Sequence, residues 1–108
     1  MKETFGEYVK RLRTENNLTL TQLAAKLDMD SANLSKVENG RRDFDEKRLD
    51  KLADFLKLDI DKLKTEFFSD FIAKKIYQTK CCDETLALAE EKIKYLQLKE
   101  IKQGTLNL

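Results

Sequence analysis

Apolar residues recur at spacings of three and four along much of the chain, which is the pattern of amphipathic α-helices. Two such helices follow each other closely between Leu18 and Gly40. The apolar stripe of the first consists of Leu20, Leu23, Ala24 and Leu27. Thr19 stands just before this stripe, and a threonine hydroxyl at that place accepts from the free N–H groups of a helix N-terminus. The pattern therefore predicts a helix that begins after Thr19 and ends at Leu27.

A second, shorter helix is predicted from Asp30 or Ser31 to about Asn39, and Gly40 is suited to the left-handed turn that ends it. Its strongly apolar residues are Leu34 and Val37. The side chains left to face outward are Ser31, Ala32, Asn33, Ser35 and Lys36. Small and hydrogen-bonding side chains suit entry into a DNA major groove, where bulk and negative charge would obstruct. The alternative interpretation is an ordinary solvated helix surface.

Three more helices are predicted around this pair. One runs from Glu3 or Thr4 to Asn16, one is capped by Asp45 and ends at Leu56 or Leu58, and a short one begins at Asp59. Their apolar residues are, in chain order, Phe5, Tyr8, Val9 and Leu12, then Leu49, Leu52, Ala53 and Leu56, then Ile60 and Leu63. Phe44, just before the fourth helix, is suited to pack against its first turn as a hydrophobic staple. The expected fold is an all-α, five-helix domain over residues 1–66.

Two roles compete for Arg13 in the first helix. It either touches DNA phosphate or pairs with Glu38, the acidic residue in the second half of the helix that precedes Gly40. A carboxylate beside Leu34 and Val37 is costly unless it is matched by a positive charge. This cost favours the pair.

Three segments of the chain resemble a known family: VKRLR in the first helix, LTLTQLAAKLDMD leading into SANLSKVENGRR, and RLDKLADFLKLD afterwards. From Phe5 to about Leu63 the sequence is similar to the lambda-repressor-like, or xenobiotic-response-element, helix-turn-helix family of bacterial and phage transcription regulators. The resemblance implies a five-helix fold that binds double-stranded DNA. It also implies that the arginine at Arg13 pairs with the glutamate at Glu38.

The resemblance further implies which residues contact DNA. Positions matching Ser31, Ala32 and Lys36 commonly face base edges, and we add Asn33 from the same surface. The position matching Asn39 commonly touches the DNA backbone. The full set of expected phosphate contacts is Thr19, Thr21, Gln22, Asn39, Arg41 and Arg42. The chain departs from the family at Leu20, where many members place a phosphate-binding glutamine. Thr19 and Thr21, with the helix N-terminus, are groups that can substitute for it.

The overall charge does not favour a nucleic-acid binder. The chain has 21 Lys and Arg against 20 Asp and Glu, a formal net charge of +1. Phosphate contacts supply much of the affinity of DNA-binding proteins. Basic residues gather at Lys10, Arg11 and Arg13, and again at Arg41 and Arg42. We therefore expect moderate and strongly salt-dependent affinity.

Residues 67–108 form a C-terminal helical extension that the motif does not explain. The segment TEFFSDFIAKKIYQ is predicted to be helical with an aromatic face, and a further helix is predicted from Asp83 to about Gln103. The extension either packs over the preceding domain or forms a subunit interface, and reading a palindromic operator requires a dimer. The residues expected at a homodimer interface are Phe67, Phe68, Phe71, Ile72, Ile76, Leu86, Ile93 and Leu96.

The remaining chemistry of the sequence argues against other classes. There is no histidine, and the adjacent Cys81 and Cys82 are read as reduced thiols because a disulfide between neighbours is strained. No phosphate-binding glycine loop or nucleophile–base pair is visible, so we expect no enzyme, no metal and no other cofactor. No apolar stretch reaches the roughly 18 residues of a membrane span and no signal peptide is seen, so we expect a cytoplasmic protein.

Two hypotheses result. The leading one is a dimeric, sequence-specific DNA-binding transcription regulator, a repressor that reads a palindromic operator with residues 30–39, without an evident small-molecule ligand. The alternative is a protein-interaction module, such as an antitoxin or anti-regulator, whose tail binds a partner protein. The near-neutral charge and the aromatic tail support the alternative.

Overall fold

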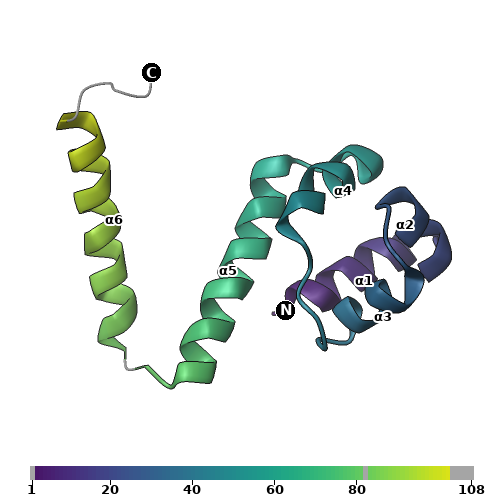
Figure 1. Ribbon diagram of the computed structural model, residues 1–108, viewed down its shortest axis with the longest axis horizontal. Helices are drawn as coiled ribbons and strands as arrows, with labels where there is room; N and C mark the ends of the chain where they lie inside the picture. Colours follow the sequence, from purple (N-terminus) through teal and green to yellow (C-terminus); the bar gives the residue numbers. More distant parts are fainter. Residues whose placement is uncertain (1, 82, 103–108) are drawn as a thin grey trace. The chain divides into compact units, whose positions relative to one another are not determined.

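The computed structural model of the protein describes residues 2–81 and 83–102. Within these residues all regular structure is helical (Figure 1). The elements are α1 (Phe5–Glu15), α2 (Leu20–Lys26), α3 (Ser31–Glu38), a short 3-10 helix η1 (Glu46–Arg48), α4 (Leu49–Leu56), α5 (Ile60–Thr79) and α6 (Glu84–Lys102). The all-α class predicted from the sequence is confirmed, while the predicted end of the last helix at Gln103 lies outside the described residues.

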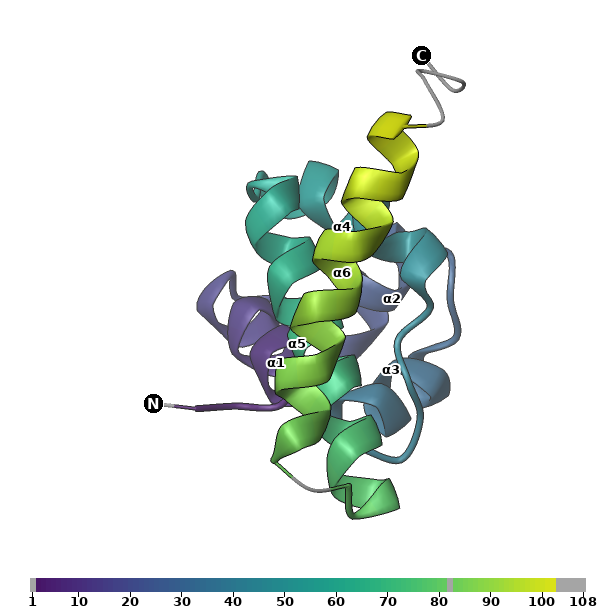
Figure 2. The same ribbon diagram turned by 90° about the vertical axis from the view of Figure 1, so that its left-hand side faces the viewer.

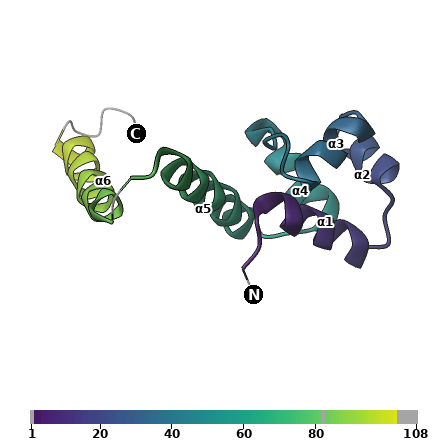
Figure 3. The same ribbon diagram turned by 90° about the horizontal axis from the view of Figure 1, so that it is seen from below.

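The chain divides into two units, of which the first ends at Lys74 and the second begins at Lys75. Helices α1 to α4 cluster in the first unit in every view (Figures 1, 2 and 3). Its core consists of Phe5, Val9, Leu23, Ala24, Leu27, Leu34, Val37, Phe44, Leu49, Leu52, Ala53 and Leu63. Nearly all of these are residues that the apolar spacing predicted to be inside. The domain boundary after residue 66 stays a prediction.

Helix α5 is longer than the short fifth helix predicted from the sequence. It runs without interruption for 20 residues, so the aromatic segment of the extension is its continuation. The residues between 60 and 79 include no glycine or proline, and nothing local therefore ends the helix. Only its first part packs on the core, through the buried Leu63 and the partly buried Phe67.

Helix ends in the first unit are fixed by local hydrogen bonds. Thr4 and Thr19 cap α1 and α2 in reciprocal capping boxes, and the Asp30 side chain accepts from the backbone N–H of Ala32 at the start of α3. Asp45 caps η1 and not α4 directly. The caps at Thr19, Asp30 and Asp45 were predicted from the sequence, with Asp45 displaced by one short 3-10 turn, whereas Thr4 was expected only near the start of α1 and not as its cap.

The turns after α1, α2 and α3 use left-handed residues, which are Asn17, Asp28 and Gly40. After α3, the backbone N–H of Gly40 donates to the Val37 carbonyl and that of Arg41 donates to the Lys36 carbonyl. This pair of hydrogen bonds ends a helix and reverses the direction of the chain. Beyond it, the segment leading to η1 is extended (Figures 1 and 2). Asparagine and aspartate tolerate the left-handed region better than most residues, which explains how a chain with three glycines makes these turns.

Gly6 allows α1 to pack closely against the end of α3. It is buried, and a Cβ atom built on it would lie 2.2 Å from the carbonyl oxygen of Val37. No side chain larger than hydrogen fits there unless the backbone of one helix moves.

Replacing Gly6 with alanine should therefore destabilise the protein. We expect the free energy of unfolding to fall by about 1–3 kcal/mol, although alanine favours helix by roughly 1 kcal/mol over glycine. Urea denaturation of the full chain measures this change. Lys10→Ala, at an exposed position of the same helix, is the control and should have little effect. Unchanged stability of Gly6→Ala would show that the two helices are not held at this distance.

Candidate nucleic-acid interface

Helix α3 is anchored along one edge and open along the other. Leu34 and Val37 are 0% and 3% exposed, and both belong to the core. Ala32 and Lys36 are exposed, whereas Ser31, Asn33 and Ser35 are half-buried. The outward surface is thus the small and polar one expected from the sequence.

The buried carboxylate of Glu38 is held by Arg13. The Arg13 Nε and Nη2 atoms lie 2.8 and 3.0 Å from the two carboxylate oxygens of Glu38, and Nη1 donates to the Leu18 carbonyl at 2.9 Å. Hydrogen bonding to Glu38 raises the pKa of the Arg13 guanidinium above its ordinary value. The ion pair expected between these residues is thus present, and it ties α1 to both α3 and the start of α2. Arg13 is consequently not free to contact phosphate.

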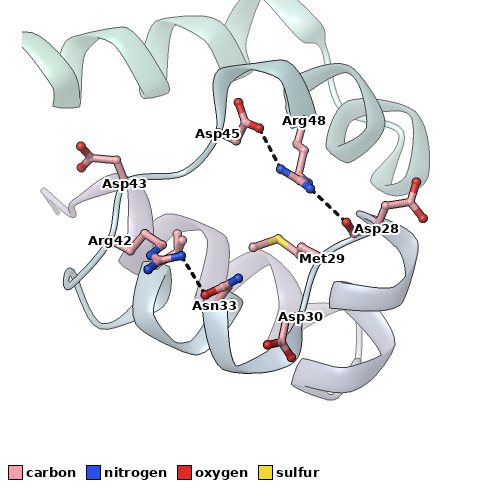
Figure 4. Close-up of a pocket in the computed structure, with 9 residues that line it drawn as sticks. Asp28, Met29, Asp30, Asn33, Arg42, Asp43, Asp45 and Arg48 are labelled. Atoms are coloured by element: carbon pink, nitrogen blue, oxygen red, sulfur yellow. Dashed lines mark hydrogen bonds and ion pairs between the residues drawn. The ribbon is translucent and has the colours of Figure 1, made fainter.

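A second arginine, Arg48, holds the corner between α2 and α3. Its Nε and Nη2 atoms donate to the carbonyls of Leu27 and Asp28 at 2.8 and 3.0 Å, and Nη1 pairs with Asp45 at 2.8 Å (Figure 4). All three nitrogens of the guanidinium are therefore used within the domain. Lys51 also pairs with the Asp28 carboxylate, which lowers the pKa of that group.

The residues expected to contact phosphate at the start of α2 are partly engaged already. The Thr19 hydroxyl accepts from the backbone N–H of Gln22 at 3.1 Å, and the Gln22 side-chain oxygen accepts from the backbone N–H of Thr19 at 2.9 Å. The Gln22 amide N–H₂ and the exposed Thr21 hydroxyl still have donors to offer. The capping box thus holds Gln22 in one orientation at the helix N-terminus.

Polar residues at the two ends of α3 are linked to neighbours. Arg42 Nη1 donates to the Asn33 Oδ1 atom at 2.9 Å, and Asn39 Nδ2 donates to the Ser35 hydroxyl at 3.4 Å. Arg41 is exposed, and no side-chain contact is assigned to it among the described residues. One residue expected to read bases, Asn33, is therefore bonded to one expected to bind phosphate, Arg42.

The basic cluster predicted in α1 is mostly neutralised. Arg11 forms ion pairs with Glu3 at 2.8 Å and Glu15 at 3.3 Å, and these carboxylates raise the pKa of its guanidinium. Arg13 is engaged with Glu38. Of these three basic residues, only Lys10 has no carboxylate partner in the part of the chain that the structure describes.

A hollow of about 380 Å³ lies between the α2–α3 corner and the segment that follows α3 (Figure 4). The residues that line it include the acidic Asp28, Asp30, Asp43 and Asp45, the basic Arg42 and Arg48, and Asn33. Two of the carboxylates are paired, since Asp45 bonds to Arg48 and Asp28 to Lys51. Asn33 and Arg42 are bonded to each other at its edge.

The residues expected at a dimer interface fall into two groups. Phe67 packs against Phe5 with ring centroids 5.2 Å apart, so it contributes to the first unit as in the alternative of packing over the domain. The large apolar side chains that remain exposed in this set are Phe68, Phe71, Ile72, Leu86, Ile93 and Leu96, while Ile76 is half-buried.

Other chemistry adds little to the site. The described residues contain no group of three or more His, Cys, Asp or Glu side chains that could hold a metal ion. Cys81 is an exposed free thiol, and Cys82 lies outside the described residues. No helix in the described part of the chain is long and apolar enough to cross a membrane.

Three structural contributors were not identified from the sequence. Gly6 was hidden because a glycine inside a helix gives no sign of what packs on it. Arg48 and Arg42 act on partners 21 and nine residues away, so no helical spacing links them to those partners.

Comparisons with known proteins agree with this geometry. A family model described as helix-turn-helix matches residues 9–63. The HTH-type transcriptional repressor RghR of Bacillus subtilis (strain 168) is 36% identical over 83 residues, which cover 73% of this chain and 62% of that protein. The chain thus spans less than two thirds of that relative's length. A crystal structure of a transcriptional regulator from Listeria innocua superposes with a TM-score of 0.53 at 25% identity, covering 99% of this chain and 100% of that one.

Removing the charge of Glu38 should weaken the fold at the end of α3. We expect Glu38→Gln to lower the free energy of unfolding by about 3 kcal/mol, because Arg13 then lacks its counter-charge in a mostly buried place. Urea denaturation tests this expectation. Glu15→Gln, which removes an exposed partner of Arg11, is the matched control and should change stability little. Equal effects of the two substitutions would contradict the structural role of the buried pair.

Proposed function

Because the chain belongs to the lambda-repressor-like helix-turn-helix family, we propose that it is a transcription repressor that binds specific double-stranded DNA sequences through α3. One observation carries the proposal. Helix α3 is fixed along the edge of Leu34, Val37 and Glu38, while its opposite surface presents small and polar side chains. The function as a repressor is further supported by the similarity to RghR, whose name describes it as one.

The proposed base contacts are Ser31, Ala32, Asn33 and Lys36. Lys36 is exposed and has no carboxylate partner among the described residues, so its ammonium group is available to a base edge or a phosphate. The proposed phosphate contacts are Thr19, Thr21, Gln22, Asn39, Arg41 and Arg42. Arg41 directly follows the turn at Gly40, and its exposed guanidinium has no competing carboxylate there.

A dimer is part of the proposal because a single helix reads only a few base pairs. Two copies related by a two-fold axis place two α3 helices in successive major grooves, about one helical turn apart on a palindromic site. The exposed apolar side chains of α5 and α6 support the extension as the contact between copies. Leu86, Ile93 and Leu96 share one side of α6 and are each more than half exposed.

Lys36→Ala should reduce binding to the preferred operator by about tenfold and relax the base preference at one or two positions. The operator is first selected from random duplex DNA with the full chain, and affinities are then measured at several salt concentrations. Lys64→Ala, an exposed lysine on α5, is the matched control and should bind as the unmodified protein does. Arg41→Ala should instead weaken binding to all sequences alike and flatten the salt dependence. Normal operator binding by Lys36→Ala would contradict the role of α3.

The proposed dimer is tested by two leucines on opposite sides of α6. Leu96 and Leu98 are 58% and 62% exposed, and two positions along a helix turn the side chain by more than half a circle. We expect the full chain to be a dimer by analytical ultracentrifugation, Leu96→Asp to be largely monomeric and Leu98→Asp to remain dimeric. A monomeric unsubstituted protein would overturn the dimer and favour a tail that binds a different protein.

A further inference from the structure

We propose that Arg42 is a positioning residue that orients the side chain of Asn33, so that α3 offers the Asn33 N–H₂ group to the DNA bases. This inference rests on the proposed function and deepens it. A residue outside the helix would thus help to determine which bases the helix recognises.

The backbone turn after α3 brings Arg42 back to the beginning of the helix. Gly40 has a φ of +76°, and the N–H groups of Gly40 and Arg41 bond to carbonyls of the last turn of α3. The chain therefore reverses, and Arg42 reaches a residue nine positions earlier. Figure 4 shows the two side chains directed toward each other across the edge of the hollow.

The chemistry of the bond sets the orientation of the amide. A guanidinium group only donates hydrogen bonds, so the atom of Asn33 that faces Arg42 at 2.9 Å must be the oxygen Oδ1. The Nδ2 atom then points away from Arg42, and no hydrogen bond is assigned to it among the described residues. Without Arg42, both ends of the amide would be free to face outward by rotation about a broad torsion.

An N–H₂ group left free to meet a base selects hydrogen-bond acceptors. In the major groove, guanine offers O6 and N7 and thymine offers O4, whereas cytosine presents an N–H₂ donor. A fixed donor at Asn33 thus discriminates against cytosine at the base that it faces. The charge of Arg42 alone, acting on a phosphate, would raise affinity without any such preference.

The DNA test uses the full chain and its selected operator. The position that loses its preference in Asn33→Ala is changed to each of the four base pairs, and binding is measured for the unsubstituted protein, Arg42→Ala, Asn33→Ala and the double variant. We expect Arg42→Ala to reduce discrimination among the four base pairs at this position by up to about tenfold. The double variant should lose no more of this discrimination than Asn33→Ala alone. Arg41→Ala is the matched control and should keep the preference.

A different result would overturn the inference. If Arg42→Ala weakens binding to all four base pairs by the same factor, so that discrimination among them is unchanged, and lowers the salt slope by about one, Arg42 acts on phosphate alone and does not orient Asn33. Additive losses in the double variant would likewise exclude action through Asn33.

A second measurement needs no DNA. In the ¹⁵N-labelled full chain, the side-chain N–H₂ signals of Asn33 are identified by their absence in Asn33→Ala. Arg42→Ala should shift these signals, and Arg41→Ala should not. Unshifted signals in Arg42→Ala would show that the bond is absent in solution and would overturn the inference. If the protein selects no DNA sequence, the proposed function fails, while these spectra still decide whether Arg42 holds Asn33.

Discussion

The buried pair of Arg13 and Glu38 is the contact on which the geometry of α3 depends. Its guanidinium joins three parts of the chain that lie far apart in sequence, namely α1, the linker before α2 and the last turn of α3. A planar group that donates in fixed directions constrains angles as well as distances. Arg48 does the same at the other end of α2, and close packing at Gly6 removes the remaining freedom between α1 and α3. The exposed surface of α3 is thus held by contacts made on its buried side.

The near-neutral charge of the chain is distributed partly as ion pairs. Many ionic groups neutralise each other inside the first unit, as in the pairs of Arg11 with Glu3, Arg48 with Asp45 and Lys51 with Asp28. Net charge therefore measures poorly what a ligand would meet at a given surface. The proposed interface relies on few unpaired cations, chiefly Lys36 and Arg41, and on hydrogen bonds from oriented neutral groups. Specificity in such an interface depends more on placement than on long-range attraction.

The sequence was sufficient for the helices and the core because both follow from local rules. Apolar spacing found the buried faces, and hydroxyl and carboxylate residues marked most helix starts. The pairing of Arg13 with Glu38 was accessible because an acid on an apolar edge needs a partner. The length of α5 was missed because the sequence contains no signal for a helix end there and a break was inferred from the end of the motif. The partners of Arg42 and Arg48 within the protein could not be predicted, since they are defined by the path of the chain after α3.

The turn that ends α3 has an evolutionary consequence. The outward residues of α3 are not part of the core, so most of them can vary with little loss of stability, and the proposed base contacts can therefore change without unfolding the domain. Position 33 is different, since its side chain is coupled to the residue that the turn at Gly40 brings back to it. On the proposed coupling, a change of specificity at this point requires two compatible substitutions, at 33 and 42, and we expect these two positions to change together among related regulators.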